Sequence, residues 1–330
     1  MKLIVFNQSI LIYYLNIIGS IIQWLAYIMN EDYIIAVEGL VKKYTEKNAL
    51  NGIDMHIKRG EMYAFLGPNG AGKTTTVRIL STLTNFDEGS VIIDGHDIRK
   101  EPRQAKASIG VIQQQISLDK DLTVWENMMV HALYHKIPRA ERRKRIDELA
   151  DYVGLREYYN RSVNSLSGGW KKKVAIVCAL IDKPKILFLD EPTVGLDIQS
   201  RRSLWDLLRK LNDDGMTIFL TTHYIEEAES LCTRISIINS GKIIAEDTPE
   251  NLSKKLGSFT VEHYGNDRKT QYHYFDTKDE ADAYSKSLPE DVTVTVRRTN
   301  LSDCFVELTG NQIEANGSMM KGDSKKGGMA

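Results

Sequence analysis

The sequence has little cysteine and no excess of charge of either sign. Only three of its 330 residues are cysteines, Cys178, Cys232 and Cys304, and no two of them form a C-x-x-C pair. This pattern argues against a disulfide framework, a zinc site or a dithiol redox site, and it favours a reducing compartment. The 43 Lys and Arg residues nearly balance the 44 Asp and Glu residues, so the formal net charge is −1. We therefore do not expect nucleic acid as a partner.

The length suggests about two domains of ordinary size. A hydrophobic fraction of 42% and a charged fraction of 26% are usual for a globular protein. We expect a hydrophobic N-terminal extension, a main α/β domain, a small accessory domain and a disordered tail. Their expected ranges are residues 1–30, 31–252, 253–312 and 313–330.

The N-terminal extension includes a stretch without charged residues, from residue 9 to residue 29. At about 1.5 Å per residue, a helix of this length could cross a hydrocarbon core of about 30 Å. One interpretation is a membrane anchor, and the other is that the protein begins at Met29. A signal peptide is disfavoured, because Gly19 and Ser20 make a poor cleavage site and the apolar stretch is long for one.

The rest of the chain alternates short strand patterns with helical patterns, which indicates an α/β fold. The expected strands lie at residues 33–37, 55–57, 62–66, 91–93, 186–189 and 217–221. The expected helices lie at residues 75–83, 139–153 and 170–180. Beyond residue 249, residues 259–310 show a strand, a helix at 277–287 and a strand at 292–297, which predicts a small α+β domain. The tail is rich in Gly, Lys, Ser and Met.

A glycine-rich loop fits the phosphate-binding pattern G-x-x-x-x-G-K-[ST] between an expected strand and an expected helix. The glycines allow backbone N–H groups to surround a phosphate, Lys73 reaches the β- and γ-phosphates, and the Thr74 hydroxyl can bind Mg²⁺. The loop consists of Gly67, Pro68, Asn69, Gly70, Ala71, Gly72, Lys73 and Thr74.

Two carboxylates, Asp190 and Glu191, follow the apolar strand at residues 186–189. The carboxyl ends of strands are where α/β sheets bind ligands. Asp190 is predicted to hold Mg²⁺, as a Walker B aspartate does. Glu191 is predicted to orient or deprotonate the water that attacks the γ-phosphate.

Two further candidates lie elsewhere in the chain. Ser167, Gly168 and Gly169 precede a helical run and would form a second anion-binding loop, one more than a single nucleotide needs. His223 follows the strand at residues 217–221, from where it could bond to the γ-phosphate.

Together these motifs resemble the nucleotide-binding subunit of an ATP-binding cassette (ABC) transporter over about residues 33–252. The resemblance implies a P-loop NTPase fold with a helical signature subdomain, and an enzyme that hydrolyses ATP with Mg²⁺. It implies that Leu166 to Gly169 form the signature and that Thr75 joins the phosphate loop in binding nucleotide. It also gives Gln114 a role near the magnesium, Asp197 the role of the D-loop aspartate, His223 that of the switch histidine, and Tyr44 that of the aromatic that stacks on adenine.

Two segments are similar to single-cassette exporters related to daunorubicin-resistance ATPases: residues 117–127 and residues 301–310. In this family the signature of one subunit completes the phosphate site of another. We therefore expect a head-to-tail dimer with a second copy, and a separate transmembrane permease that places the protein at the cytoplasmic face of the membrane. The alternative is a non-transport cassette acting on ribosomes or DNA. The 117 positions from Lys73 to Asp190 leave no room for the long insertion that such relatives often carry.

The sequence departs from the family pattern at two positions. Trp170 stands where the signature often has Gln or Met, and Gln113 stands where Pro is common. Spacing from the strand that begins near Ile109 favours Gln114 over its neighbours Gln113 and Gln115 as the residue that faces the magnesium.

Two remaining patterns are interpreted without a catalytic role. His131 and His135 have the i, i+4 spacing of zinc ligands, but no third ligand is evident, so we interpret them as core or surface histidines. The basic runs at residues 142–145 and 171–173 are interpreted as solvated helix faces, because acidic residues lie near them.

Overall fold

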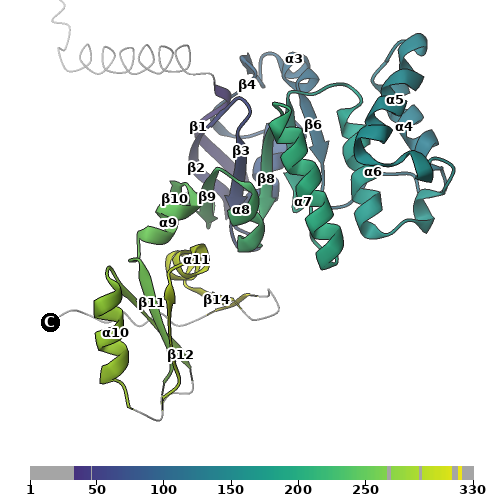
Figure 1. Ribbon diagram of the computed structural model, residues 1–330. Helices are drawn as coiled ribbons and strands as arrows, with labels where there is room; N and C mark the ends of the chain where they lie inside the picture. The colour runs from purple at the N-terminus through teal and green to yellow at the C-terminus, as the bar shows by residue number, and fades with distance from the viewer. Residues whose placement is uncertain (1–32, 46, 266–268, 290–291, 314–318, 322–330) are drawn as a thin grey trace, which may run out of the picture.

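The computed structural model describes residues 33–45, 47–265, 269–289, 292–313 and 319–321 (Figure 1). The proposed N-terminal anchor at residues 9–29 lies outside the described residues. Among the residues that are described, no helix is long and apolar enough to cross a membrane.

A six-stranded sheet forms the centre of the fold, in the order β10-β9-β3-β8-β7-β6. The five strands from β9 to β6 are parallel, and β10 pairs antiparallel with β9 at the edge. The strands are β3 (Met62–Leu66), β6 (Ile109–Ile112), β7 (Ile186–Asp190), β8 (Thr217–Thr222), β9 (Arg234–Asn239) and β10 (Lys242–Asp247). Because these strands are parallel, the loops after β3, β6, β7 and β8 emerge at the same edge.

A four-stranded antiparallel sheet, in the order β2-β1-β4-β5, lies against the central sheet. Its strands are β1 (Tyr33–Tyr44), β2 (Lys47–Lys58), β4 (Glu88–Ile93) and β5 (His96–Asp97). The expected strands at residues 33–37, 55–57 and 91–93 are present, but each is part of a longer strand. The pairing of β1 with β2 has several register shifts, and such bulges let long strands curve.

Alternate residues of the central strands enter two different cores, which explains why these strands are apolar throughout. Tyr63 and Phe65 of β3 pack with Phe188 and Phe219 toward the four-stranded sheet. The intervening residues of β3 face the second core, which contains the helices on the other side of the sheet.

The helices α4, α5 and α6 form a group at one end of the molecule (Figure 1). The helices of the main domain are α2 (Lys73–Leu80), α3 (Pro102–Ala107), α4 (Val124–Tyr134), α5 (Arg139–Val153), α6 (Gly168–Leu180), α7 (Ile198–Asp213), α8 (Ile225–Leu231) and α9 (Pro249–Lys254). Short 3₁₀ turns at Arg156–Tyr158 and Val163–Ser165 connect α5 to α6. The expected helix at residues 139–153 is confirmed, whereas α2 begins two residues before the expected start at residue 75 because the phosphate loop itself leads into the helix.

The C-terminal region contains a three-stranded antiparallel sheet in the order β12-β11-β13. Its elements are β11 (Phe259–Tyr264), β12 (Thr270–Phe275), α10 (Lys278–Ser287), β13 (Val294–Arg298) and α11 (Leu301–Thr309). Helix α11 packs on α8 and α9, and the buried residues Leu301, Cys304 and Phe305 belong to the same core as the main domain. The C-terminal elements are therefore joined to the main domain by apolar packing.

Part of the segment expected to be a disordered tail is described. Residues 319–321 form β15 (Met319–Lys321), which pairs antiparallel with β14 (Asn311–Ile313). The rest of the expected tail lies outside the described residues, so its disorder stays a prediction.

Candidate functional site

The phosphate loop connects β3 to α2, and two of its glycines have no room for a side chain. A Cβ atom at Gly67 would lie 2.4 Å from the Ile238 carbonyl oxygen, and one at Gly72 would lie 2.7 Å from the Ala49 carbonyl oxygen. Gly72 also has a φ of +113°, a conformation that favours glycine. The loop therefore packs against β2 and β9 while its backbone leads directly into the N-terminus of α2.

The side chain of Lys73 is buried at the start of α2. Its Nζ donates to the carbonyl oxygens of Gly67, at 2.8 Å, and Pro68, at 3.1 Å. It also lies 3.1 Å from Oε1 of Glu191. Burial lowers the pKa of Lys73, and the nearby Glu191 carboxylate limits that decrease. The amino group thus lies inside the loop, beside a carboxylate.

Asp190 is the last residue of β7, and two hydroxyl groups bond to it. Its Oδ1 accepts hydrogen bonds from Thr221 Oγ1 at 2.6 Å and from Thr74 Oγ1 at 3.2 Å. The residue is 4% exposed, so these bonds compensate for the burial of its charge. The ends of β7 and β8 and the first turn of α2 therefore converge on one carboxylate.

Glu191 contacts three other predicted site residues. Its Oε1 lies 3.2 Å from Nδ1 of His223, in addition to its contact with Lys73, and its Oε2 accepts a hydrogen bond from Gln114 Nε2 at 3.3 Å. Burial alone would raise the pKa of Glu191, but the contacts with His223 and Lys73 outweigh it and leave the pKa below its usual value. The backbone of Glu191 has a φ of +47°, and its N–H bonds to the Thr221 carbonyl oxygen at 3.0 Å. This backbone turn directs the carboxylate toward the phosphate loop.

These residues line a pocket of about 450 Å³. Besides Lys73, Gln114, Glu191 and His223, its lining residues are Ala49, Asn69, Gly70, Gly72, Thr74, Thr75 and Val194. Of the three consecutive glutamines, Gln114 lines this pocket. Gln113 lines a separate groove between β6, α4 and α6, whose lining residues include Ile112, His131 and Cys178.

The second predicted anion-binding loop lies outside this pocket. Ser167 is the exposed N-cap of α6, and within the described residues its side chain makes no capping hydrogen bond. A Cβ atom at Gly169 would lie 2.7 Å from Ser200 Oγ, so the loop packs closely on the first turn of α7. Asp197 caps that turn by accepting bonds from the Ser200 N–H, at 2.8 Å, and the Ser200 hydroxyl, at 2.6 Å. Within one chain, none of Ser167, Gly168, Gly169 and Asp197 is among the described residues that line the pocket with Lys73.

Residues 50–194 match the ABC transporter family model. The chain is 41% identical over 228 residues to the linearmycin resistance ATP-binding protein LnrL of Bacillus subtilis. This match covers 69% of this chain and 73% of the relative. The chain is also 34% identical over 313 residues to the daunorubicin resistance ATP-binding protein DrrA2 of Streptomyces coeruleorubidus. This second match covers 86% of this chain and 97% of the relative.

The chain belongs to the ATP-binding proteins of ABC transporters. It is an ATPase subunit of such a transporter, in the exporter branch related to daunorubicin-resistance ATPases that the sequence motifs indicated.

Solved ABC cassettes share its fold. The structure of cbiO1 from Clostridium perfringens, part of a cbiONQ complex, is 34% identical and has a TM-score of 0.63, over 68% of this chain and 92% of the other. The dimeric structure of MJ0796, a bacterial ABC transporter cassette, is 32% identical and has a TM-score of 0.59, over 65% of this chain and 98% of the other.

Tyr44, the predicted adenine-stacking residue of the cassette, ends β1. Its side chain is 45% exposed, and Nζ of Lys42 lies 5.2 Å from its ring centroid. It is not among the described residues that line the phosphate pocket, although Ala49 of the same hairpin is. Its stacking on adenine therefore stays a prediction.

Two assignments from the sequence need correction or addition. The interpretation of residues 171–173 as a solvated helix face was wrong for Lys172, which is 4% exposed. Thr221 was assigned no role, yet its hydroxyl bonds to Asp190 and also accepts a bond from the Glu191 N–H at 3.2 Å. One signal in the sequence indicated the role of Thr221, namely a hydroxyl residue at the end of a buried strand.

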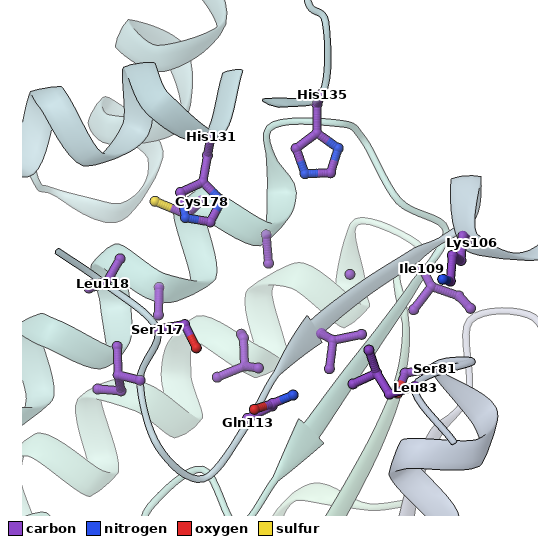
Figure 2. Close-up of a pocket in the computed structure, with 16 residues that line it drawn as sticks. Ser81, Leu83, Lys106, Ile109, Gln113, Ser117, Leu118, His131, His135 and Cys178 are labelled. Atoms are coloured by element: carbon purple, nitrogen blue, oxygen red, sulfur yellow. The ribbon is translucent and has the colours of Figure 1, made fainter. Parts of the chain in front are cut away.

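His131 and His135 lie on α4 and at its C-terminal end, on one side of the separate groove (Figure 2). Nδ1 of His135 lies 3.0 Å from Oδ2 of Asp182. Neither histidine lies in the phosphate pocket.

Proposed function

We propose that this cassette hydrolyses ATP with Mg²⁺ in a head-to-tail dimer and thereby drives a separate membrane permease that exports a drug-like molecule. One observation carries the proposal: the chain has a pocket lined by the predicted phosphate loop and, away from it, the exposed Ser167 and Gly168 of the second predicted anion-binding loop. The names of the relatives support export. They include linearmycin and daunorubicin resistance proteins, from which we take the drug-like class of the exported molecule, and also Nod factor export proteins.

The pocket residues fit a nucleotide with magnesium. Backbone N–H groups of the phosphate loop and the N-terminus of α2 favour the phosphates, and Lys73 would exchange its loop carbonyls for phosphate oxygens. The hydroxyl of Thr74 and the carboxylate of Asp190 already lie 3.2 Å apart, and both are oxygen donors of the kind that Mg²⁺ prefers. These two residues and Gln114 would hold the ion, which when bound neutralises charge on the phosphate oxygens.

Glu191 has the surroundings of a general base. Its contacts with His223 and Lys73 favour the ionised carboxylate, and an ionised carboxylate beside the phosphate loop can accept the proton of a water that attacks the γ-phosphate. Gln114 and His223 contact the same carboxylate and would orient it and the γ-phosphate. For Glu191 to act, its contact with Lys73 must be replaced by contacts of Lys73 with phosphate.

The second anion-binding loop suits the nucleotide of a partner copy. Ser167 and Gly168 are exposed, the N-terminus of α6 carries a partial positive charge, and its first turn contains no acidic residue. Exposed Ile198 and Asp197 lie beside this loop, at the start of α7. In the proposed dimer, Ser167 and the amides of Gly168 and Gly169 donate to the γ-phosphate bound by the partner subunit. Loss of that phosphate removes the bridging bonds and opens the dimer.

The permease would dock in the separate groove near Gln113 (Figure 2). The groove has a volume of about 380 Å³ and a mainly apolar lining from β6, the segment after it, α4 and α6. Lys106, His131 and His135 supply basic or titratable groups. This composition suits a short amphipathic helix that carries an acidic side chain on the cytoplasmic side of the permease.

Residues 31–252 would form the ATPase domain and residues 253–312 an accessory domain. N-terminal sequencing of the purified protein would decide between a start at Met1, with the hydrophobic stretch as an anchor, and a start at Met29.

The decisive experiment is to size a Glu191→Gln variant with saturating ATP and magnesium. We expect a stable dimer, because nucleotide binds but the γ-phosphate is retained. Glu250→Gln, which neutralises an exposed carboxylate on α9, is the matched control and should hydrolyse ATP and show no trapped dimer. If Glu191→Gln stays monomeric, the dimer proposal fails. Co-purification with ribosomes rather than with a multi-span membrane protein would overturn the transport role.

A further inference from the structure

Lys172 is a buried cation on the signature helix that the proposed mechanism does not use. It is 4% exposed, whereas its neighbours Lys171 and Lys173 are only partly buried. Burial lowers the pKa of Lys172, and the carboxylates of Asp190 and Glu227 oppose that decrease. A buried ammonium group is costly unless it is paired and hydrogen-bonded, so its position is specific.

The Lys172 ammonium bonds to the backbone that carries the pocket glutamine. Its Nζ donates to the carbonyl oxygen of Gln114 at 3.2 Å and lies 3.4 Å from that of Gln113. Both carbonyls follow the end of β6, where no sheet ladder holds them. Lys172 therefore fixes this segment to α6.

A continuous series of contacts runs from the signature to the catalytic carboxylate. Lys172 lies three residues after Gly169, which is about one helical turn. From Lys172 the contacts continue to the Gln114 backbone, and from the Gln114 side chain to Glu191 at 3.3 Å. The ammonium group of Lys172 thus links the first turn of α6 to the ATP pocket of the same chain.

We propose that Lys172 is a positioning residue that couples the two ATP sites of the dimer. When Ser167 binds the phosphate held by the partner subunit, α6 shifts, and Lys172 carries Gln114 with it into the position that orients Glu191. The inference rests on the proposed dimer. It adds a route by which occupancy of one pocket sets the geometry of the other.

The test compares Lys172→Met with Lys172→Arg, and uses Lys171→Met as the matched control. Lys171 is the preceding residue in the sequence, and its Nζ donates to the Asn164 carbonyl oxygen at 3.2 Å in an exposed position. For each variant we would measure kcat and KM for ATP, the Hill coefficient, the thermal midpoint, and the affinity of the dilute monomer for a fluorescent ATP analogue.

For Lys172→Met we expect kcat to fall at least about tenfold, because misplacement of a catalytic group by about 1 Å can cost a hundredfold. The monomer should keep its ATP affinity within about twofold, and the Hill coefficient should fall from about 2 toward about 1. Lys172→Arg should restore both values, since it keeps the charge and the donors. Lys171→Met should match the unmodified protein. If Lys172→Met does not fold, Lys172→Ala, which also removes the charge and the donors, serves in its place.

The possible failures are distinguishable. An unchanged kcat and Hill coefficient in folded Lys172→Met, with Glu191→Gln still trapping a dimer, overturns the role of Lys172 alone. A loss of monomer ATP affinity equal to the loss of kcat would show a general structural role and would also overturn it. If Glu191→Gln never dimerises, the dimer itself is refuted and the coupling with it.

Discussion

Oε1 of Glu191 lies 3.1 Å from Nζ of Lys73, so the residue predicted to activate water also binds the residue predicted to hold phosphate. Phosphate must therefore compete with a carboxylate for the same ammonium group. The contact keeps both charges paired in a buried pocket, and nucleotide binding would separate them.

This competition predicts two opposite effects of Glu191→Gln. Without the carboxylate, Lys73 is easier to recruit, so the affinity of the monomer for ATP should increase roughly threefold, or about 0.7 kcal/mol. Hydrolysis should fall by at least about a hundredfold, since the general base is lost. Equilibrium titration of dilute protein and phosphate release measure the two effects separately. Weaker ATP binding in the variant would show that the contact does not compete with phosphate.

The packing of the phosphate loop predicts that Gly67→Ala is strongly destabilising. The added methyl group would lie 2.4 Å from a backbone oxygen, which cannot move without disturbing β9, so we expect a loss of roughly 3 kcal/mol in the free energy of unfolding. Gly52→Ala is the control: its φ is +76°, but no described atom lies within 4 Å of the new carbon, and about 1 kcal/mol is expected. Urea unfolding compares them, and equal losses would contradict the steric argument.

The position of Gln114 predicts a difference between adjacent glutamines. Gln114→Ala removes the amide that contacts Glu191 and should lower kcat by about tenfold to a hundredfold. Gln115→Ala, at an exposed position outside the pocket lining, should stay within about twofold of the unmodified protein. Steady-state ATPase assays decide this, and a larger effect at Gln115 would move the assignment by one residue.

The surroundings of Asp94 predict a stability that depends on pH. Burial alone would raise its pKa, but hydrogen bonds from Lys185, Ser108 and Arg59 outweigh this and lower the pKa to about 2. The pKa of an aspartate in the unfolded chain is near 3.9, so the ionised Asp94 contributes roughly 2 kcal/mol to the free energy of unfolding above about pH 4. That contribution disappears as the pH falls toward 2.

Asp94→Asn isolates this charge, since Asn also tolerates the positive φ of 50° at this position. The variant should be less stable than the unmodified protein at pH 7, and the difference should shrink below pH 4. Urea unfolding at pH 7, 4 and 3 measures it. A difference that grows on acidification would be the wrong sign for this mechanism.

The packing of α11 predicts that the C-terminal region does not unfold separately. Phe305 is fully buried in the core shared with α8 and α9, so Phe305→Ala should cost about 3–5 kcal/mol. We expect a single unfolding transition at a lower temperature in calorimetry. Two resolved transitions, with the one for the ATPase domain unchanged, would show an independent accessory domain.

The phosphate loop and the strand ends could be predicted because their chemistry is local. Lys73 and Thr74 follow glycines in a recognisable pattern, and Asp190 with Glu191 ends an apolar run, so one short stretch of sequence specifies each feature. The parallel sheet then brings these strand ends together without further information.

The role of Lys172 could not be predicted because it depends on a distant segment. In a run of three lysines the sequence shows only charge, and a solvated face is the usual result. The partners of this buried ammonium group are two carbonyls 58 and 59 residues earlier in the chain, with the carboxylates of Asp190 and Glu227 nearby. Similarly, the contact of Glu191 with both Lys73 and His223 depends on a left-handed backbone turn that the sequence does not reveal.

The close approach of Gly169 to Ser200 has a practical consequence for chimeric cassettes. In the segment 166–169, Gly168 and Gly169 lie close to Leu196 and Ser200, and Asp197 fixes the second segment, the opening turn of α7, by capping it. An exchange of only the first segment with that of another transporter would bring mismatched surfaces together. The smallest interchangeable unit is therefore both segments at once, although almost thirty positions separate them in the sequence.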